Sequence, residues 1–135
     1  MEFVIGLVLA LAVTGFATAI GLDRDRAFYP TVLIVVASYY VLFATMAASS
    51  QIVLVETLVG VAFLLVAVIG FKTSLWLVAA ALAGHGAFDF VHSLAIANPG
   101  VPQWWPGFCL AFDVTAAAVL AVLLTTRSRL STNSG

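Results

Sequence analysis

The chain has 135 residues, of which 64% are hydrophobic and 8% are charged, and its mean hydropathy is +1.19. Soluble domains carry about 25% charged residues, so this composition excludes a soluble globular protein and indicates an integral membrane protein. The net charge of −1 comes without a cluster of basic residues, which excludes a nucleic-acid-binding surface.

Five apolar runs predict an all-α fold, a polytopic transmembrane helical bundle of about five spans. The first run, residues 3–22, is too long and too evenly apolar for a cleaved signal peptide, and Glu2 stands where a basic flank is usual. We therefore expect it to be retained as a span. The other spans are predicted at residues 27–48, 52–71, 74–97 and 108–126.

The connections are expected to be short, because each span uses about 20 residues. Residues 23–26 (DRDR) are interpreted as a solvated cap. The segment 98–107 holds three prolines and two glycines, which cannot continue a helix. We expect residues 1–126 to form a single bundle and residues 127–135 to form a frayed polar tail in the cytoplasm.

The basic residues predict how the bundle is oriented, because Lys and Arg accumulate in short cytoplasmic loops. With five spans, all the basic residues fall on one side: Arg24, Arg26, Lys72, Arg127 and Arg129. This distribution places the N-terminus outside and the C-terminus inside. Trp104 and Trp105 then lie at the outer interface, where indole rings anchor a membrane protein.

The stretch GHGAFDFVH, residues 84–92, puts two histidines and an aspartate inside an apolar span. At 100° per residue, His85, Asp89 and His92 fall within an arc of about 60°, so their side chains share one helix face. Glu56 and Asp113 are expected at a similar depth, in the outer half of the bilayer. A charged residue at the bilayer centre costs roughly 2.5–3.5 kcal/mol, so we expect all five to face inward and form one cluster.

Imidazole and carboxylate side chains are common ligands of divalent Zn, Fe and Mn. His85 and Asp89 have the spacing of a helical chelate, and His92, Asp113 and Glu56 would complete a site with three or four ligands. We therefore predict a divalent-metal site made of these five residues, with His85, Asp89 and Glu56 as candidate catalytic residues. The single cysteine, Cys109, is interpreted as a packing residue.

Three segments, residues 55–71, 84–92 and 101–114, together resemble a family of small uncharacterised bacterial integral membrane proteins. The family pattern has a Glu at the head of one span, an H-x-x-[aromatic]-D-x-x-H run in the next, and a P-x-[W/Y]-[W/Y]-P-x-x-C-x-x-x-D segment before the last. The matching residues, within about residues 30–120, are Glu56, His85, Phe88, Asp89, His92, Pro102, Trp104, Trp105, Pro106, Cys109 and Asp113. The resemblance implies a shared membrane fold in the bacterial inner (cell) membrane, and it implies no known reaction.

Three functions stay open on the sequence, and whether the protein is an enzyme stays open with them. A metal site in the outer half of the bilayer would support hydrolysis or hydroxylation of a lipid-like substrate that enters sideways. A metal-free site would instead support acid/base chemistry such as double-bond isomerisation. The third function is a proton- or cation-coupled carrier or channel component, which favours a homo-oligomer because five helices make a thin conduit.

Overall fold

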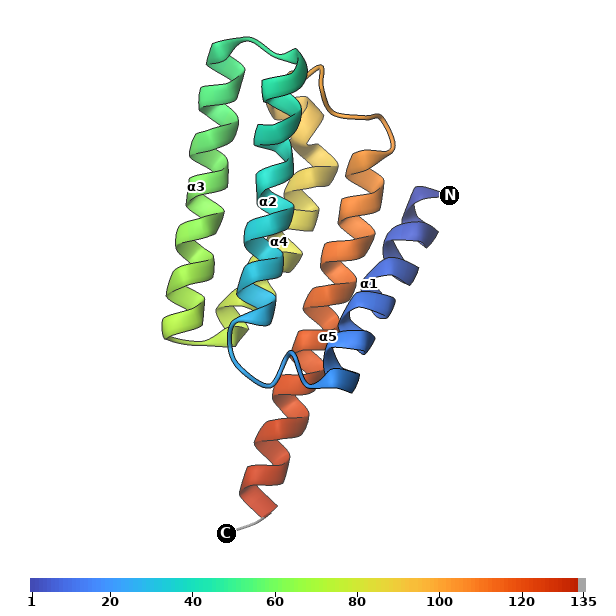
Figure 1. Ribbon diagram of the computed structural model, residues 1–135, viewed down its shortest axis with the longest axis vertical. Coiled ribbons are helices and arrows are strands. Elements are labelled where there is room, and N and C mark those ends of the chain that lie inside the picture. Colours follow the sequence, from blue (N-terminus) through green and yellow to red (C-terminus); the bar gives the residue numbers. More distant parts are fainter. Residues whose placement is uncertain (134–135) are drawn as a thin grey trace.

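The computed structural model describes residues 1–133, and the side chains of residues 1–129, as an all-helical bundle without strands (Figure 1). Its elements are α1 (Glu2–Ile20), α2 (Phe28–Ala47), α3 (Ser50–Lys72), α4 (Leu75–Ala95) and α5 (Trp105–Asn133). All five helices are long and apolar enough to cross a membrane, by length and composition. The predicted all-α fold with five candidate spans is confirmed, and it fits a multi-pass membrane protein.

Local sequence signals explain where the helices begin and end. Ser49 precedes α3 and accepts a hydrogen bond from the Ile52 N–H at 3.4 Å, and Ser74 accepts one from the Trp76 N–H before α4 at 3.3 Å. Both serines thereby satisfy an N–H group that has no partner inside the helix. At the other end of α1, Gly21 adopts a φ of 78°, a left-handed conformation that glycine reaches without a steric penalty.

The fifth helix differs from the prediction at both ends. It begins at Trp105 rather than Phe108, with Pro106 in its first turn, where the missing N–H costs no hydrogen bond. It continues to Asn133, seven residues beyond the predicted end of the span at residue 126. No glycine or proline lies between residues 108 and 133 to stop the helix. Residues 134–135 of the predicted tail lie outside the described residues.

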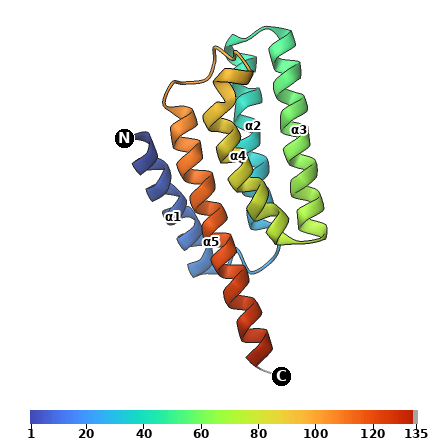
Figure 2. The same cartoon turned by 180° about the vertical axis from the view of Figure 1, so that it is seen from behind.

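The helices are arranged around α5, which lies between α1 and α4 (Figures 1 and 2). On the other side of the bundle α2 pairs with α3, and α4 contacts both of them. Close approach of α1 to α5 depends on Gly6, where an added Cβ would collide with the carbonyl oxygen of Phe108. Small residues of this kind let helices pack tightly in lipid, where no hydrophobic effect drives them together.

The two halves of the bundle have different interiors. The half that holds the α1–α2 and α3–α4 connections is packed with apolar side chains, including the fully buried Leu33, Leu82 and Leu120. The other half holds the α2–α3 and α4–α5 connections (Figure 1). Its buried polar residues are Glu56, His85, Asp89, His92, Asn98 and Asp113. We call these residues the polar layer. Elsewhere in the described interior, the buried polar groups include Thr14, Asp23 and the hydroxyl of Tyr29.

The α1–α2 connection is less solvated than predicted. Asp23 is only 2% exposed; its Oδ2 accepts a hydrogen bond from the Thr18 hydroxyl at 2.9 Å and lies 3.5 Å from Arg127 Nη2. Arg26 donates to the carbonyls of Gly70 and Phe71 at the end of α3. The interpretation of residues 23–26 as a solvated cap was therefore wrong for Asp23, because Thr18 and Arg127 enclose its carboxylate.

Candidate metal centre

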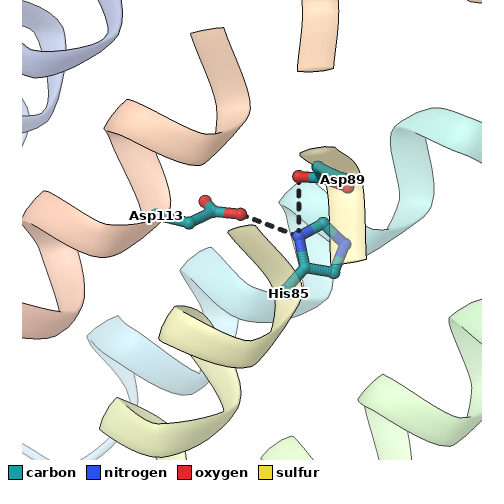
Figure 3. Close-up of side chains that lie close together, drawn as sticks. All are labelled: His85, Asp89 and Asp113. Atoms are coloured by element: carbon teal, nitrogen blue, oxygen red, sulfur yellow. Dashed lines mark hydrogen bonds and ion pairs between the residues drawn. The ribbon is translucent and has the colours of Figure 1, made fainter. Parts of the chain in front are cut away.

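Three buried side chains from two helices meet in the polar half of the bundle (Figure 3). His85 and Asp89 lie one turn apart on α4, and Asp113 faces them from α5. His85 Nδ1 lies 2.7 Å from Oδ2 of Asp113 and 3.2 Å from Oδ2 of Asp89. One ligand atom from each residue lies within 4.8 Å of the other two, which is close enough for one metal ion to reach all three. We call these residues the inner triad.

A glycine next to His85 sets the distance between the two helices. A Cβ at Gly86 would lie 3.1 Å from the Asp113 Cβ and 3.3 Å from the Leu110 carbonyl oxygen, so a larger residue there would press on α5. Gly84, on the other side of His85, has no heavy atom within 4 Å of an added Cβ. Gly86 therefore allows Asp113 to reach His85, whereas Gly84 has no such role.

The inner triad is incomplete as a hydrogen-bonded structure. Asp89 and Asp113 are both 0% exposed, yet both oxygens of Asp89 and Oδ1 of Asp113 have no hydrogen-bond partner. Leaving a charged group buried without a partner costs several kcal/mol. One imidazole cannot compensate two carboxylates, so the donor set fits either a divalent cation or a proton shared between the acids.

A second buried pair lies closer to the end of the bundle. Glu56 on α3 has its Oε1 2.8 Å from His92 Nε2, and the same oxygen accepts a hydrogen bond from Asn98 Nδ2 at 2.8 Å. Asn98 also donates to the Tyr40 carbonyl at 3.1 Å. The second oxygen of Glu56, Oε2, is buried without a partner. Asn98 thus ties the α4–α5 connection to α2 and α3.

Tyr40 on α2 lies between the Glu56–His92 pair and the inner triad. Its ring stacks on His92, with centroids 4.0 Å apart, and lies at 6.5 Å from the His85 ring. Its hydroxyl is buried without a hydrogen-bond partner. The Tyr40 ring therefore lies next to both the Glu56–His92 pair and the inner triad.

An apolar cavity of about 420 Å³ approaches the polar layer from the side of the bundle. It lies between α1, α2 and α5, and we call it the lateral groove. Its lining comprises Leu9, Val13, Phe28, Thr31, Val32, Val35, Val36, Tyr39, Trp105, Phe108, Cys109 and Phe112. Cys109, which is 2% exposed, also packs with Tyr40 and Trp105 in a buried cluster, so the groove and the polar layer meet at this residue.

Another cavity, of about 530 Å³, opens at the end of the bundle beside the α4–α5 connection. We call it the end cavity. It is lined by His92, Ser93, Ile96, Ala97, Asn98, Pro99, Val101, Pro102, Gln103 and Pro106. His92 and Asn98 belong both to this lining and to the hydrogen-bonded group around Glu56, so the cavity ends at the two side chains that bond to Glu56.

The five predicted metal ligands are thus divided between two places. His85, Asp89 and Asp113 form the inner triad. Glu56 and His92 face the interior, as expected, but bond to each other. Their role as metal ligands, and the catalytic role of Glu56, stay predictions.

Two residues near the site were misjudged or missed on the sequence. Trp104 is 52% exposed, but Trp105 is 9% exposed and lines the lateral groove, so the prediction that it anchors at the interface was wrong. The first turn of α5 directs it inward. Asn98 was missed, because an Asn before Pro in a connection is typical of a turn and gives no sign of a long-range partner.

No protein family, no curated protein and no solved structure matches this chain.

Proposed function

We propose that this chain is an integral membrane protein that binds one divalent cation at the inner triad. The observation that carries the proposal is the convergence of ligand atoms from His85, Asp89 and Asp113 within 4.8 Å of one another, in a fully buried setting. Three protein ligands with a remaining open position are typical of catalytic metal sites rather than structural ones. The mixed imidazole and carboxylate set suits Zn, Fe or Mn.

Charge balance supports a cation at this position. Two ionised carboxylates beside a neutral imidazole carry two negative charges, which a divalent ion cancels. The unpartnered oxygens of Asp89 and Asp113 provide lone pairs for it. Ligand atoms around tetrahedral zinc, at about 2.0 Å from the ion, stand roughly 3.3 Å apart. His85 Nδ1 and Asp113 Oδ2 lie 2.7 Å apart, a hydrogen-bond distance, so an ion that binds both atoms would have to displace the proton between them and move the two atoms apart.

The lateral groove supports a lipid-like substrate for this site. Its apolar lining faces the bilayer side of α1, α2 and α5, and its floor at Cys109 adjoins the polar layer. A hydrocarbon chain lying in the groove would bring an adjoining polar group towards the inner triad. A bound cation would act there as a Lewis acid that polarises an oxygen of the substrate. According to this proposal, the protein is an enzyme whose substrate is a lipid-like molecule.

The proposed location is the bacterial inner membrane, with the N-terminus outside, the C-terminus in the cytoplasm and the polar layer in the outer half. It is supported by the positions of the five basic residues, which all lie at the apolar end of the bundle. Cytoplasmic loops carry the excess of Lys and Arg in membrane proteins.

A metal-free acid/base enzyme is the second candidate. It is favoured by the 2.7 Å contact between His85 and Asp113, a hydrogen-bond distance at which a proton can pass between imidazole and carboxylate. On this alternative Asp89 and Asp113 share a proton, because two like charges at close range cannot both be stable.

Metal content separates the two candidates. The protein purified in detergent without chelators should hold about one Zn, Fe or Mn ion per chain by elemental analysis, as expected for a mononuclear site. His85→Ala and Asp89→Asn should lose the metal, whereas Cys109→Ala should keep it, because Cys109 packs with Tyr40 and Trp105.

Asp23→Asn is the matched control, since it makes the same chemical change at another buried carboxylate, in the opposite half of the bundle. It should retain the metal. Wild-type protein that remains metal-free after incubation with salts of all three metals contradicts the proposal and favours the acid/base candidate.

A further inference from the structure

The Glu56–His92 pair lies between the end cavity and the inner triad. His92 and Asn98 line the cavity, and Glu56 bonds to both. Beyond them, the Tyr40 ring stacks on His92 and lies 6.5 Å from the His85 ring. Along α4, successive turns carry His92, Asp89 and His85, so each polar group is followed within about one turn by the next.

The pair has the ligand chemistry for a divalent cation but too few ligands to hold one firmly. It offers one imidazole and one carboxylate, and the Glu56 Oε2 is buried without a partner. The inner triad offers three ligand atoms. Since affinity grows with the number of ligands, a cation should stay only briefly at the Glu56–His92 pair and much longer at the inner triad.

The lateral groove is a poor route for an ion. Its lining is almost entirely hydrocarbon and aromatic, and a cation crossing it would lose its hydration without gaining charged ligands. The end cavity, in contrast, leads from the end of the bundle to the His92 imidazole, which is bonded to the Glu56 carboxylate. The two cavities therefore offer separate routes, one for an apolar chain and one for an ion.

We propose that divalent cations reach the inner triad through the end cavity and that Glu56 and His92 form a transfer site on the way. This inference rests on the proposed function, because it requires the inner triad to bind a cation. Asn98 has a positioning role. Its amide donates a hydrogen bond to Glu56 Oε1, which holds that oxygen beside His92, and another to the Tyr40 carbonyl, which links the α4–α5 connection to α2.

The test separates the rate of metal uptake from the affinity at equilibrium. The full chain in detergent is stripped with a chelator, and binding of Co²⁺ is followed by its absorption spectrum. Glu56→Gln keeps the size of the side chain and removes its charge. It should slow both uptake and chelator-driven loss by about tenfold, the effect of a 1.4 kcal/mol rise in the barrier. The equilibrium affinity should stay within about twofold, because a transfer site changes both rates equally.

A second set of variants leaves the buried residues intact. Gln103 is an exposed residue at the end cavity. Gln103→Lys should slow Co²⁺ uptake and Gln103→Glu should speed it, roughly threefold each at low salt, and both effects should fade as salt screens the charge. The same changes at Thr126, exposed near the opposite end of the bundle, should have no effect.

The outcomes are distinct for the two proposals. Wild-type protein that binds no Co²⁺ at equilibrium overturns the proposed function itself. Wild-type protein that binds Co²⁺, with unchanged uptake rates in Glu56→Gln and in both Gln103 variants, overturns the transfer site alone. A Glu56→Gln protein that loses affinity without a change in uptake rate also overturns it, because Glu56 would then be a ligand of the bound ion.

Discussion

Two aspartates of the bundle occupy opposite environments. Asp89 is fully buried, and its Oδ2 lies 3.2 Å from His85 Nδ1, a nitrogen that it shares with the closer Asp113. Asp23 is also buried, but it accepts a hydrogen bond from Thr18 at 2.9 Å and lies 3.5 Å from an Arg127 nitrogen. A carboxylate with a hydrogen bond and a cation of its own stabilises a fold, whereas one that shares a single imidazole with a second carboxylate destabilises it.

The metal-free protein should therefore respond oppositely to the same substitution at these two positions. Asp89→Asn removes one of two buried charges that share a single imidazole nitrogen, and burying such a charge costs several kcal/mol, so the change should raise the melting temperature of chelator-treated protein. Asp23→Asn should lower it, because the contact with Arg127 is lost. Circular dichroism during heating in detergent measures both. A fall in melting temperature for Asp89→Asn would show that its carboxylate supports the fold without an ion.

The relative positions of side chains were predicted well within one helix. They were predicted poorly between two helices. The shared face of His85, Asp89 and His92 follows from 3.6 residues per turn, and the structure has it. The pairs between helices depend instead on which helices are neighbours. These pairs are Asp113 with His85 and Glu56 with His92. A hydropathy pattern carries no such information, so the division of the predicted cluster could not be foreseen.

At the scale of elements, the contact between α4 and α5 determines whether the inner triad exists. Two of its side chains come from α4 and one from α5, and the helices approach at Gly86. The sequence GHG places a second glycine, Gly84, on the other side of His85, where nothing lies within 4 Å of an added Cβ. The chain thus provides a matched pair of positions for testing the helix contact.

Gly86→Val should weaken metal binding at least about tenfold, because its Cβ would press on Asp113 and move that carboxylate away from His85. Gly84→Val should leave the affinity unchanged. Both variants place the same β-branched residue in the same helix, so the intrinsic helix propensity changes equally. Titration of the stripped protein with Co²⁺ gives the two affinities. Equal affinities would mean that α5 adjusts to the larger residue and that Gly86 does not set the site.

The elements themselves were predictable because apolar runs of spanning length are unmistakable. The predicted spans and the helices differ by one or two residues at each end for α1 to α4. The larger error is at α5, where polar residues after 126 were taken as the end of the helix. Thr, Arg and Ser remain compatible with a helix when no glycine or proline interrupts the chain, so polarity marks the edge of the apolar region rather than the end of the helix.

At the scale of the whole molecule, the two ends of the bundle are chemically different. All five basic residues lie at the end with the α1–α2 and α3–α4 connections, where Arg26 caps α3 and Arg127 lies beside Asp23. The opposite end carries the end cavity and the exposed Trp104. The first residue of α1 and the last described turn of α5 lie towards opposite ends of the bundle, which fits an odd number of spans (Figure 1).

This asymmetry makes the orientation testable with single cysteines. The native Cys109 is 2% exposed and should not react, which gives an unlabelled background. Gln103→Cys lies exposed at the α4–α5 connection, and Thr73→Cys lies exposed at the α3–α4 connection, beside Lys72. A membrane-impermeant maleimide added to intact bacterial cells, with the outer membrane made permeable, should label the first and spare the second.

The expected pattern follows from the cost of moving basic loops across the membrane. Arg26 adds to that cost, since its guanidinium bonds to the last carbonyls of α3 and would have to cross with them. Labelling of both cysteines only after cell lysis would place both connections inside and show that one of the five helices does not cross. Labelling of Thr73→Cys alone would invert the bundle and place the polar layer in the cytoplasmic half, so that cations entering by the end cavity would come from the cytoplasm.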